Sequence, residues 1–73
     1  MNFDELVKAR MEEQLITHPK YGGVYRLCEP IEGKQSDGSW VMGYVYQDVD
    51  SLIKYWRPAT MFGKFSIWEV EEL

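Results

Sequence analysis

Apolar side chains near the start of the chain recur at the spacing of one helical stripe. Asn2 stands where a helix cap belongs, and Glu5 stands where a capping-box carboxylate reaches back to it. Pro19 disfavours helical angles at His18 and so ends the helical pattern. We therefore expect one amphipathic helix over about residues 2–16, packed on a sheet. Its stripe consists of Phe3, Leu6, Val7, Met11 and Leu15.

After Gly22-Gly23 the pattern changes to short runs rich in β-forming residues. Residues 24–31 and 40–46 are two such runs, separated by a polar segment that contains the strong turn signal Asp37-Gly38. They predict a β-hairpin. In its second arm, one face carries Trp40, Met42, Tyr44 and Tyr46, and the other carries Val41 and Val45.

The remaining segments predict shorter elements. Residues 54–57 favour a strand that stops at Pro58, which has no N–H for a ladder, and residues 65–70 favour a last strand. Residues 48–51 fit either a turn or the cap of a helical turn at Leu52, and both alternatives stay open. The whole chain, residues 1–73, is therefore expected to be a single α+β domain. Its helix packs on an antiparallel sheet of about four strands within residues 24–70, with SH3-like or roll-like curvature.

Composition narrows the setting of this domain. At 73 residues the core must be small, and a hydrophobic content of 45% with 15% aromatic residues is enough to build one. The single cysteine excludes an internal disulfide and favours a reducing compartment. The N-terminal pattern fits no targeting sequence, and no run approaches the ~20 apolar residues of a membrane span. We expect a cytoplasmic protein without a membrane partner.

The charge balance bears on the partner. The formal net charge is −4, whereas affinity for a phosphate backbone comes from clustered Lys and Arg. Nucleic acid is therefore an unlikely primary partner, and duplex DNA is a poor candidate. An acidic chain suits a protein partner with basic surface, although the charge does not identify it.

The side chains that catalysis needs are scarce. His18 is the only imidazole, and its place before Pro19 indicates a structural or solvent-exposed role. Cys28 has no second thiol, and we expect it to behave as a small hydrophobe. Asp48 and Asp50 lack the glycine and distal Glu of a calcium loop, and the glycines match no nucleotide-binding motif. We predict that the chain is not an enzyme and holds no cofactor or metal.

The aromatic residues are the most informative feature. Three Trp, five Tyr and three Phe are more than so small a core readily buries. They either wrap a minimal core with polar tips outward or form a hot-spot patch for a protein partner, since Trp, Tyr and Arg dominate interface energetics. A third reading is base stacking on Trp40, Tyr44 or Trp56.

Three segments carry a resemblance to known proteins. They are Gly23-x-Tyr25-Arg26, the apolar run 41–46, and Trp56-Arg57-Pro58-x-x-Met61-Phe62. From Tyr21 onward the chain resembles a family of small bacterial and phage domains. In length and acidic character it is also similar to the RNA-polymerase-binding transcription regulators of lytic phages that infect Xanthomonas. That resemblance implies a protein of the host cytoplasm that binds host RNA polymerase, inhibits initiation by weakening the hold of the σ factor, and acts as an antiterminator.

The predicted partner contacts combine the charged helix face with exposed cations of the sheet. We expect a monomer that binds host RNA polymerase through these side chains. The alternative is a small module that binds RNA or single-stranded DNA through exposed aromatics. The candidate contacts are Asp4, Lys8, Glu12, Tyr21, Arg26, Lys54 and Arg57.

Overall fold

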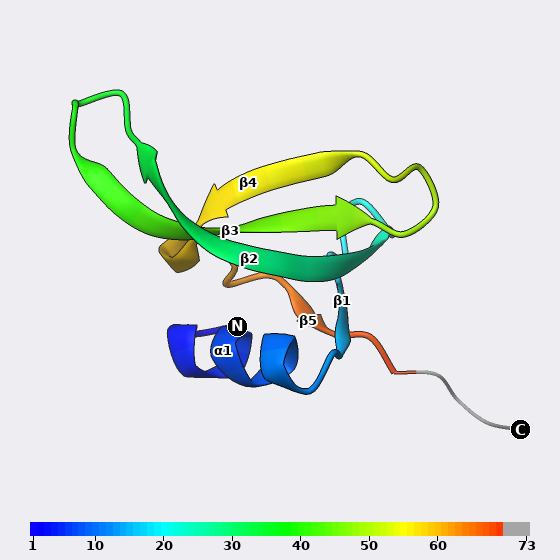
Figure 1. Cartoon of the computed structure of the whole chain (residues 1–73). Helices are drawn as coiled ribbons and strands as arrows, with labels where there is room; N and C mark the ends of the chain where they lie inside the picture. Colours follow the sequence, from blue (N-terminus) through cyan, green and yellow to red (C-terminus); the bar gives the residue numbers. More distant parts are fainter. Residues whose placement is uncertain (70–73) are drawn as a thin grey trace, which may run out of the picture.

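A computed structural model, which describes residues 1–69, shows one helix packed on a five-stranded antiparallel sheet (Figure 1). The strands lie in the order β4-β3-β2-β1-β5. The predicted α+β class is confirmed, with five strands in place of about four; Val70, the predicted end of the sheet, lies outside the described residues. The elements are α1 (Phe3–Met11), β1 (Leu15–Thr17), β2 (Val24–Lys34), β3 (Trp40–Asp48), β4 (Lys54–Pro58), the 3-10 helix η1 (Ala59–Met61) and β5 (Ser66–Ile67).

Helix α1 begins where the sequence predicts and ends earlier. The capping box is present, with Asn2 accepting from the Glu5 N–H and Glu5 accepting from the Asn2 N–H. Glu13 takes a φ of 55°, which a helix cannot continue through. The prediction of a helix to residue 16 is therefore wrong beyond Met11. Within residues 1–69, no helix has the length and apolarity needed to span a bilayer.

Strand β1 begins at residues that the sequence pattern assigns to the end of the helix. Ile16 is fully buried and pairs with Tyr25 of β2 on one side and Ile67 of β5 on the other. Two strand partners outweigh the weak helical preference of a β-branched residue. The predicted stripe is accordingly wrong at its ends: α1 buries Leu6 and Ala9, while Met11 is 75% exposed.

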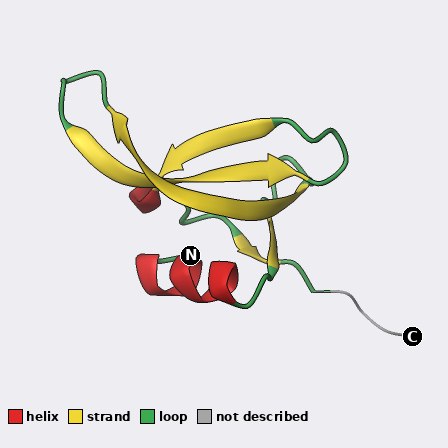
Figure 2. Ribbon diagram, in the orientation of Figure 1, coloured by secondary structure: helices red, strands yellow, loops and turns green. Residues whose placement is uncertain are grey.

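The predicted hairpin is formed by β2 and β3, and its far half projects from the body (Figures 1 and 2). β1 covers β2 only at residues 24–26, and β4 covers β3 only at residues 43–47. Beyond a register shift between Leu27 and Pro30, and from the pair Glu32 and Met42 onward, the two strands therefore pair with each other alone. We call residues 30–42, which contain this two-stranded ribbon, the arm. Its turn has Gly38 at a φ of 90° and an Asp37 side chain that accepts from Ser39.

Trp56 braces the arm from the outer face of the sheet. Its indole N–H donates to the Ile31 carbonyl at 3.0 Å, so the ring reaches from β4 across β3 to β2. A Cβ on Gly33 or Gly43 would overlap this ring. The two glycines thus provide the space in which the indole lies flat against the sheet.

The core lies between α1 and the inner face of the sheet and is built largely of rings. Phe62, which follows η1, is fully buried and meets Phe65 at 5.0 Å and Tyr46 at 5.6 Å between ring centroids. The Met1 amino group donates to the Phe62 carbonyl at 2.7 Å, which joins the start of the described chain to this cluster. Edge-to-face and tilted contacts of this kind add to the burial of apolar area.

The segment left open between a turn and a helical cap is a turn. The Asp48 carboxylate accepts from the N–H groups of Asp50 and Ser51, and Leu52 takes a φ of 65°. Hydrogen bonds from Ser51 and then Asp50 lower the pKa of Asp48. This turn brings β4 back antiparallel to β3.

Candidate functional site

A concave aromatic site lies on the inner face of the sheet, and we call it the tyrosine pocket. It has a volume of about 420 Å³. The pairing of Tyr46 with Tyr55 and of Tyr44 with Arg57 places the pocket residues of β3 and β4 on one face. The lining side chains are Tyr21, Tyr25, Tyr46, Tyr55, Arg57 and Phe65.

The pocket has a buried floor and an exposed rim. Tyr25, Tyr46 and Phe65 are each less than 10% exposed and pack edge to face. Tyr21 and Tyr55 are 60% and 43% exposed. The floor is therefore held by core packing, whereas the rim presents aromatic surface to a binding partner.

Arg57 supplies the positive charge of the pocket. Its Nε donates to the Tyr46 hydroxyl at 2.9 Å, and its guanidinium carbon lies 5.3 Å from the centre of the Phe65 ring. Within residues 1–69, the Tyr46 hydroxyl is the one side chain that Arg57 hydrogen-bonds. A guanidinium has five N–H donors, so most of them remain free for a ligand.

His18 lies behind the pocket and is only 5% exposed. Its ring packs against those of Tyr21 and Phe65, with ring centroids 4.7 Å and 4.9 Å away. Its Nδ1 accepts a hydrogen bond from the Lys20 N–H. Burial lowers the pKa of His18, and the positive charges of Arg57, Lys64 and Lys20 lower it further. The role of His18 is thus structural. These three cations therefore lie near this end of the pocket.

The Tyr25 hydroxyl of the floor is a neutral donor and acceptor at neutral pH. Burial raises the pKa of Tyr25, and the nearby Asp48 carboxylate raises it further. A phenol with a raised pKa keeps its proton. The pocket therefore offers tyrosine hydroxyls and one guanidinium.

Of the seven predicted contacts, the structure brings two into the tyrosine pocket. Tyr21 forms part of its rim and Arg57 its charged end. Arg26 and Lys54 both pair with Gln47 and so form a row on the opposite face of the sheet. These two cations do not extend the charge of the pocket.

The three predicted helix contacts form a separate group. Asp4 and Lys8 lie in α1, Glu12 is its C-cap, and all three are exposed. None of them lines the tyrosine pocket. The seven residues therefore do not form one surface.

The side chains predicted to stack bases are placed differently from one another. Tyr44 is 2% exposed because its ring packs against Phe62, so it cannot stack on a base. Trp56 lies on the outer face and uses its N–H within the sheet. Trp40 is 63% exposed on the arm. These three do not form a continuous stacking surface.

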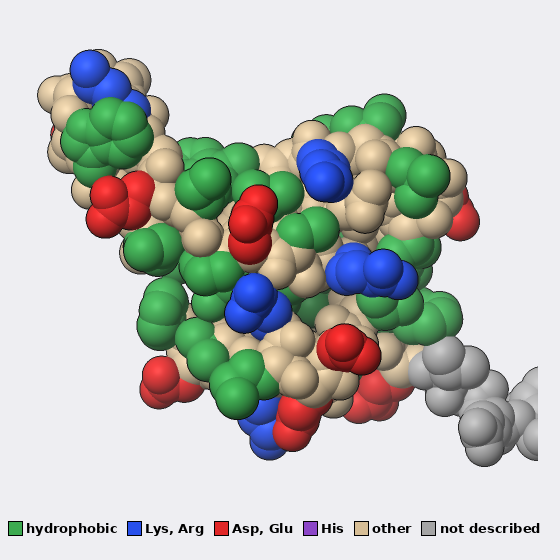
Figure 3. All heavy atoms as spheres, viewed as in Figure 1, with side chains coloured by type: hydrophobic (Ala, Val, Ile, Leu, Met, Phe, Trp, Pro, Cys, Tyr) green, Lys and Arg blue, Asp and Glu red, His purple; other side chains and the backbone are tan. Residues whose placement is uncertain are grey.

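Exposed apolar side chains lie along the inner face of the arm and at the start of α1, and we call this set the arm surface. Strand alternation places Trp40 and Met42 on the same face as Tyr44. The ring centroid of Tyr44 lies 6.5 Å from that of Phe3. Phe3, Trp40 and Met42 are 52%, 63% and 43% exposed. Hydrophobic side chains run along the left of Figure 3, from the projecting arm down to the helix. The arm surface consists of Phe3, Trp40 and Met42.

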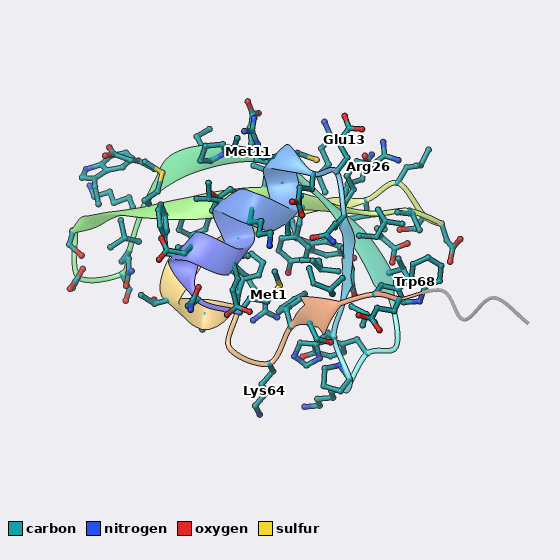
Figure 4. The ribbon with its side chains drawn as sticks, turned by 90° about the horizontal axis from the view of Figure 1, so that it is seen from below. Met1, Met11, Glu13, Arg26, Lys64 and Trp68 are labelled. Atoms are coloured by element: carbon teal, nitrogen blue, oxygen red, sulfur yellow. The ribbon has the colours of Figure 1, made fainter. Side chains whose placement is uncertain are left out.

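A second hollow, of about 600 Å³, lies beside the end of α1, where β1 stops covering β2. Arg10 closes one side by donating from Nε to the Cys28 carbonyl at 2.7 Å. Figure 4 shows Met11, Glu13 and Arg26 at this end of the helix. The hollow is lined by side chains of both signs of charge.

Sequence reasoning missed most of the pocket. Tyr25, Tyr46, Tyr55 and Phe65 drew attention only as members of an aromatic surplus. Had the turn at Asp48 been treated as a hairpin turn, it would have placed Tyr46 opposite Tyr55 and indicated a shared face. Phe65 comes from a separate segment, and no local signal links it to these strands.

In comparisons with protein-family models, with curated proteins and with solved structures, nothing matches this chain.

Proposed function

We propose that this chain is a protein-binding module that acts by occupying a surface of its partner and catalyses no reaction. The observation that supports the proposal best is the arm surface. Phe3, Trp40 and Met42 are large apolar side chains, and each is more than 40% exposed. Exposed apolar residues that gather in a patch are typical of interaction sites, whereas scattered ones are ordinary.

The arm suits this role because it is both exposed and braced. Its two strands carry Trp40 and Met42 with Glu32 and Lys34 directly opposite, so the apolar pair has a charged border. The Trp56 indole ties β4 to the start of the arm. A rigid aromatic anchor with a polar rim loses little conformational entropy on binding.

Host bacterial RNA polymerase is the partner that the resemblance implies, and it is our proposed target. In this proposal the arm surface covers a polymerase region that the σ factor or a terminator hairpin needs. Initiation would then be inhibited by steric or allosteric competition. Such an inhibitor works by stoichiometric binding and needs no reactive group.

The proposal is tested with purified RNA polymerase holoenzyme and three forms of the full chain. We expect the natural sequence to bind the enzyme and to reduce initiation in a promoter assay. Trp40→Ser combined with Met42→Ser should abolish both effects, since loss of central apolar anchors typically costs 2 kcal/mol or more each. Ile53→Ser, in the turn between β3 and β4 and 53% exposed, is the matched control and should bind normally.

Two outcomes would contradict the proposal. If no form binds holoenzyme or core enzyme, polymerase is the wrong target. If the doubly substituted arm binds as well as the Ile53→Ser control, the arm surface is the wrong contact.

A further inference from the structure

The charge around the tyrosine pocket restricts what it can hold. Cages of aromatic rings often bind cations such as methylated lysine. The tyrosine pocket, however, contains Arg57. The Lys20 ammonium also lies over the ring of Tyr21, 5.7 Å from the ring centre. Lys64 acts on the same end through its effect on His18 and projects from the loop before β5 (Figure 4). A cationic guest would be repelled by all three charges.

We propose that the tyrosine pocket binds a carboxylate-bearing segment of a peptide, with the carboxylate on Arg57 and a flat apolar side chain on the aromatic rim. The free N–H groups of Arg57 match the two oxygens of a carboxylate. Tyr21 and Tyr55 provide the rim surface for the neighbouring side chain. This inference rests on the proposed function, because it gives the protein partner a second contact besides the arm surface.

The distribution of cations favours a peptide over a nucleic-acid strand. Strand binding needs a track of cations that follows successive phosphates. Arg26 and Lys54, which could extend such a track, lie on the opposite face of the sheet. A net charge of −4 also opposes a polyanion. One guanidinium with two nearby lysines suits a single carboxylate.

The volume of the tyrosine pocket suits a small guest. Ligand sites usually measure about 300–1,000 Å³, and the pocket has about 420 Å³. Its floor is fixed by the ring packing of Tyr25, Tyr46 and Phe65. Because the floor is already ordered, little rearrangement is needed on binding.

The test uses two small probes that differ only in charge. N-acetyl-L-phenylalanine carries a ring and a carboxylate, and N-acetyl-L-phenylalaninamide carries the same ring without the charge. Each is titrated into the full, isotope-labelled chain, and two-dimensional NMR spectra are recorded. We expect the acid to shift the signals of Tyr21, Arg57 and Phe65, and the amide to bind at least about tenfold more weakly, because a charge-assisted hydrogen bond is lost.

Variants separate binding from folding. Arg57→Gln should weaken the acid about tenfold while leaving the amide unchanged. Because Arg57 also hydrogen-bonds Tyr46, a second variant is needed at a side chain that is mostly exposed. Tyr21→Ala, at a side chain 60% exposed, should weaken both probes together. Lys34→Gln, which removes an exposed arm cation, is the control and should leave both titrations unchanged.

Each remaining outcome would overturn the inference. Equal affinity for the acid and the amide would mean that the pocket recognises the ring and not the charge. Stronger binding of uridine monophosphate than of the acid would indicate a nucleotide site, and no shift with any probe would remove the site. None of these results bears on polymerase binding through the arm, which is measured separately.

Discussion

The two halves of the β2–β3 hairpin show how differently the same strands can be stabilised. In the body, β3 is flanked by β2 and β4, and Tyr44 and Tyr46 are buried against Phe62. In the arm, Trp40 and Met42 continue the same alternation but are 63% and 43% exposed. The body therefore specifies the fold, whereas the arm is free to carry recognition. Substitutions in the body should therefore change the stability of the fold, whereas substitutions in the arm should change it little.

The largest effect is expected from emptying the ring cluster of the body. Phe62→Ala removes a fully buried ring that contacts Tyr46 and Phe65. We expect a loss of about 3–5 kcal/mol in the free energy of unfolding, measured by chemical denaturation. An unchanged midpoint would show that Phe62 is not packed as described.

A smaller effect is expected where Trp56 braces the arm. Gly33→Ala places a methyl group against the indole and should cost about 1–3 kcal/mol. In a Trp56→Ala background the same substitution should cost almost nothing, because the clash is gone. Equal costs in both backgrounds would mean that the indole does not occupy this space.

Lowering the pH should decrease the stability of the folded chain through the protonation of His18. Its pKa is lowered in the folded state, so the unfolded chain binds protons more readily. The stability that His18 contributes is present above its unfolded pKa of about 6.5 and is lost as pH falls below that value. Asp37 and Asp48, whose pKa values are also lowered, add losses only near and below their ordinary 3.8.

The measurement is a series of thermal or denaturant curves between pH 7.5 and pH 5, a range chosen to lie above the titration of most carboxylates. We expect the natural chain to lose stability as pH falls through this range and His18→Phe to lose less. A flat profile for the natural chain would contradict the burial of a neutral imidazole.

The smallest effect on stability is expected in the arm. Trp40→Ala and Met42→Ala alter exposed side chains and should change the free energy of unfolding by about 0.5 kcal/mol or less. A loss comparable to that of Phe62→Ala would show that the arm belongs to the core. Denaturation midpoints for the three variants, measured side by side, decide this.

The elements that the sequence predicts well are those with local signals. Asn2 and Glu5 start the helix, and Asp37-Gly38 closes the hairpin, as their chemistry requires. The sequence pattern does not reveal strand β1, because Leu15 fits a helical stripe as readily as it fits a strand. Only pairing with Tyr25 and Ile67, distant in sequence, decides for the strand.

The candidate site was harder to predict for the same reason. Tyr21 and Arg57 were chosen as exposed residues, but their convergence depends on the curvature of the sheet and on Phe65 from another segment. Arg26 and Arg57 look alike in the sequence, yet strand alternation places them on opposite faces. The type of a side chain indicates that it could bind a partner, but the register of the strands decides which side chains share a face.

Hydrogen exchange of the chain in the presence of the proposed partner, RNA polymerase, tests the central claim most directly, because it reports which backbone amides a bound partner covers. We predict added protection in the arm, around residues 30–42, and none in the turn at residues 49–53. Protection of the turn or of the outer row at Arg26 and Lys54, with the arm unchanged, would contradict the assignment of recognition to the arm surface.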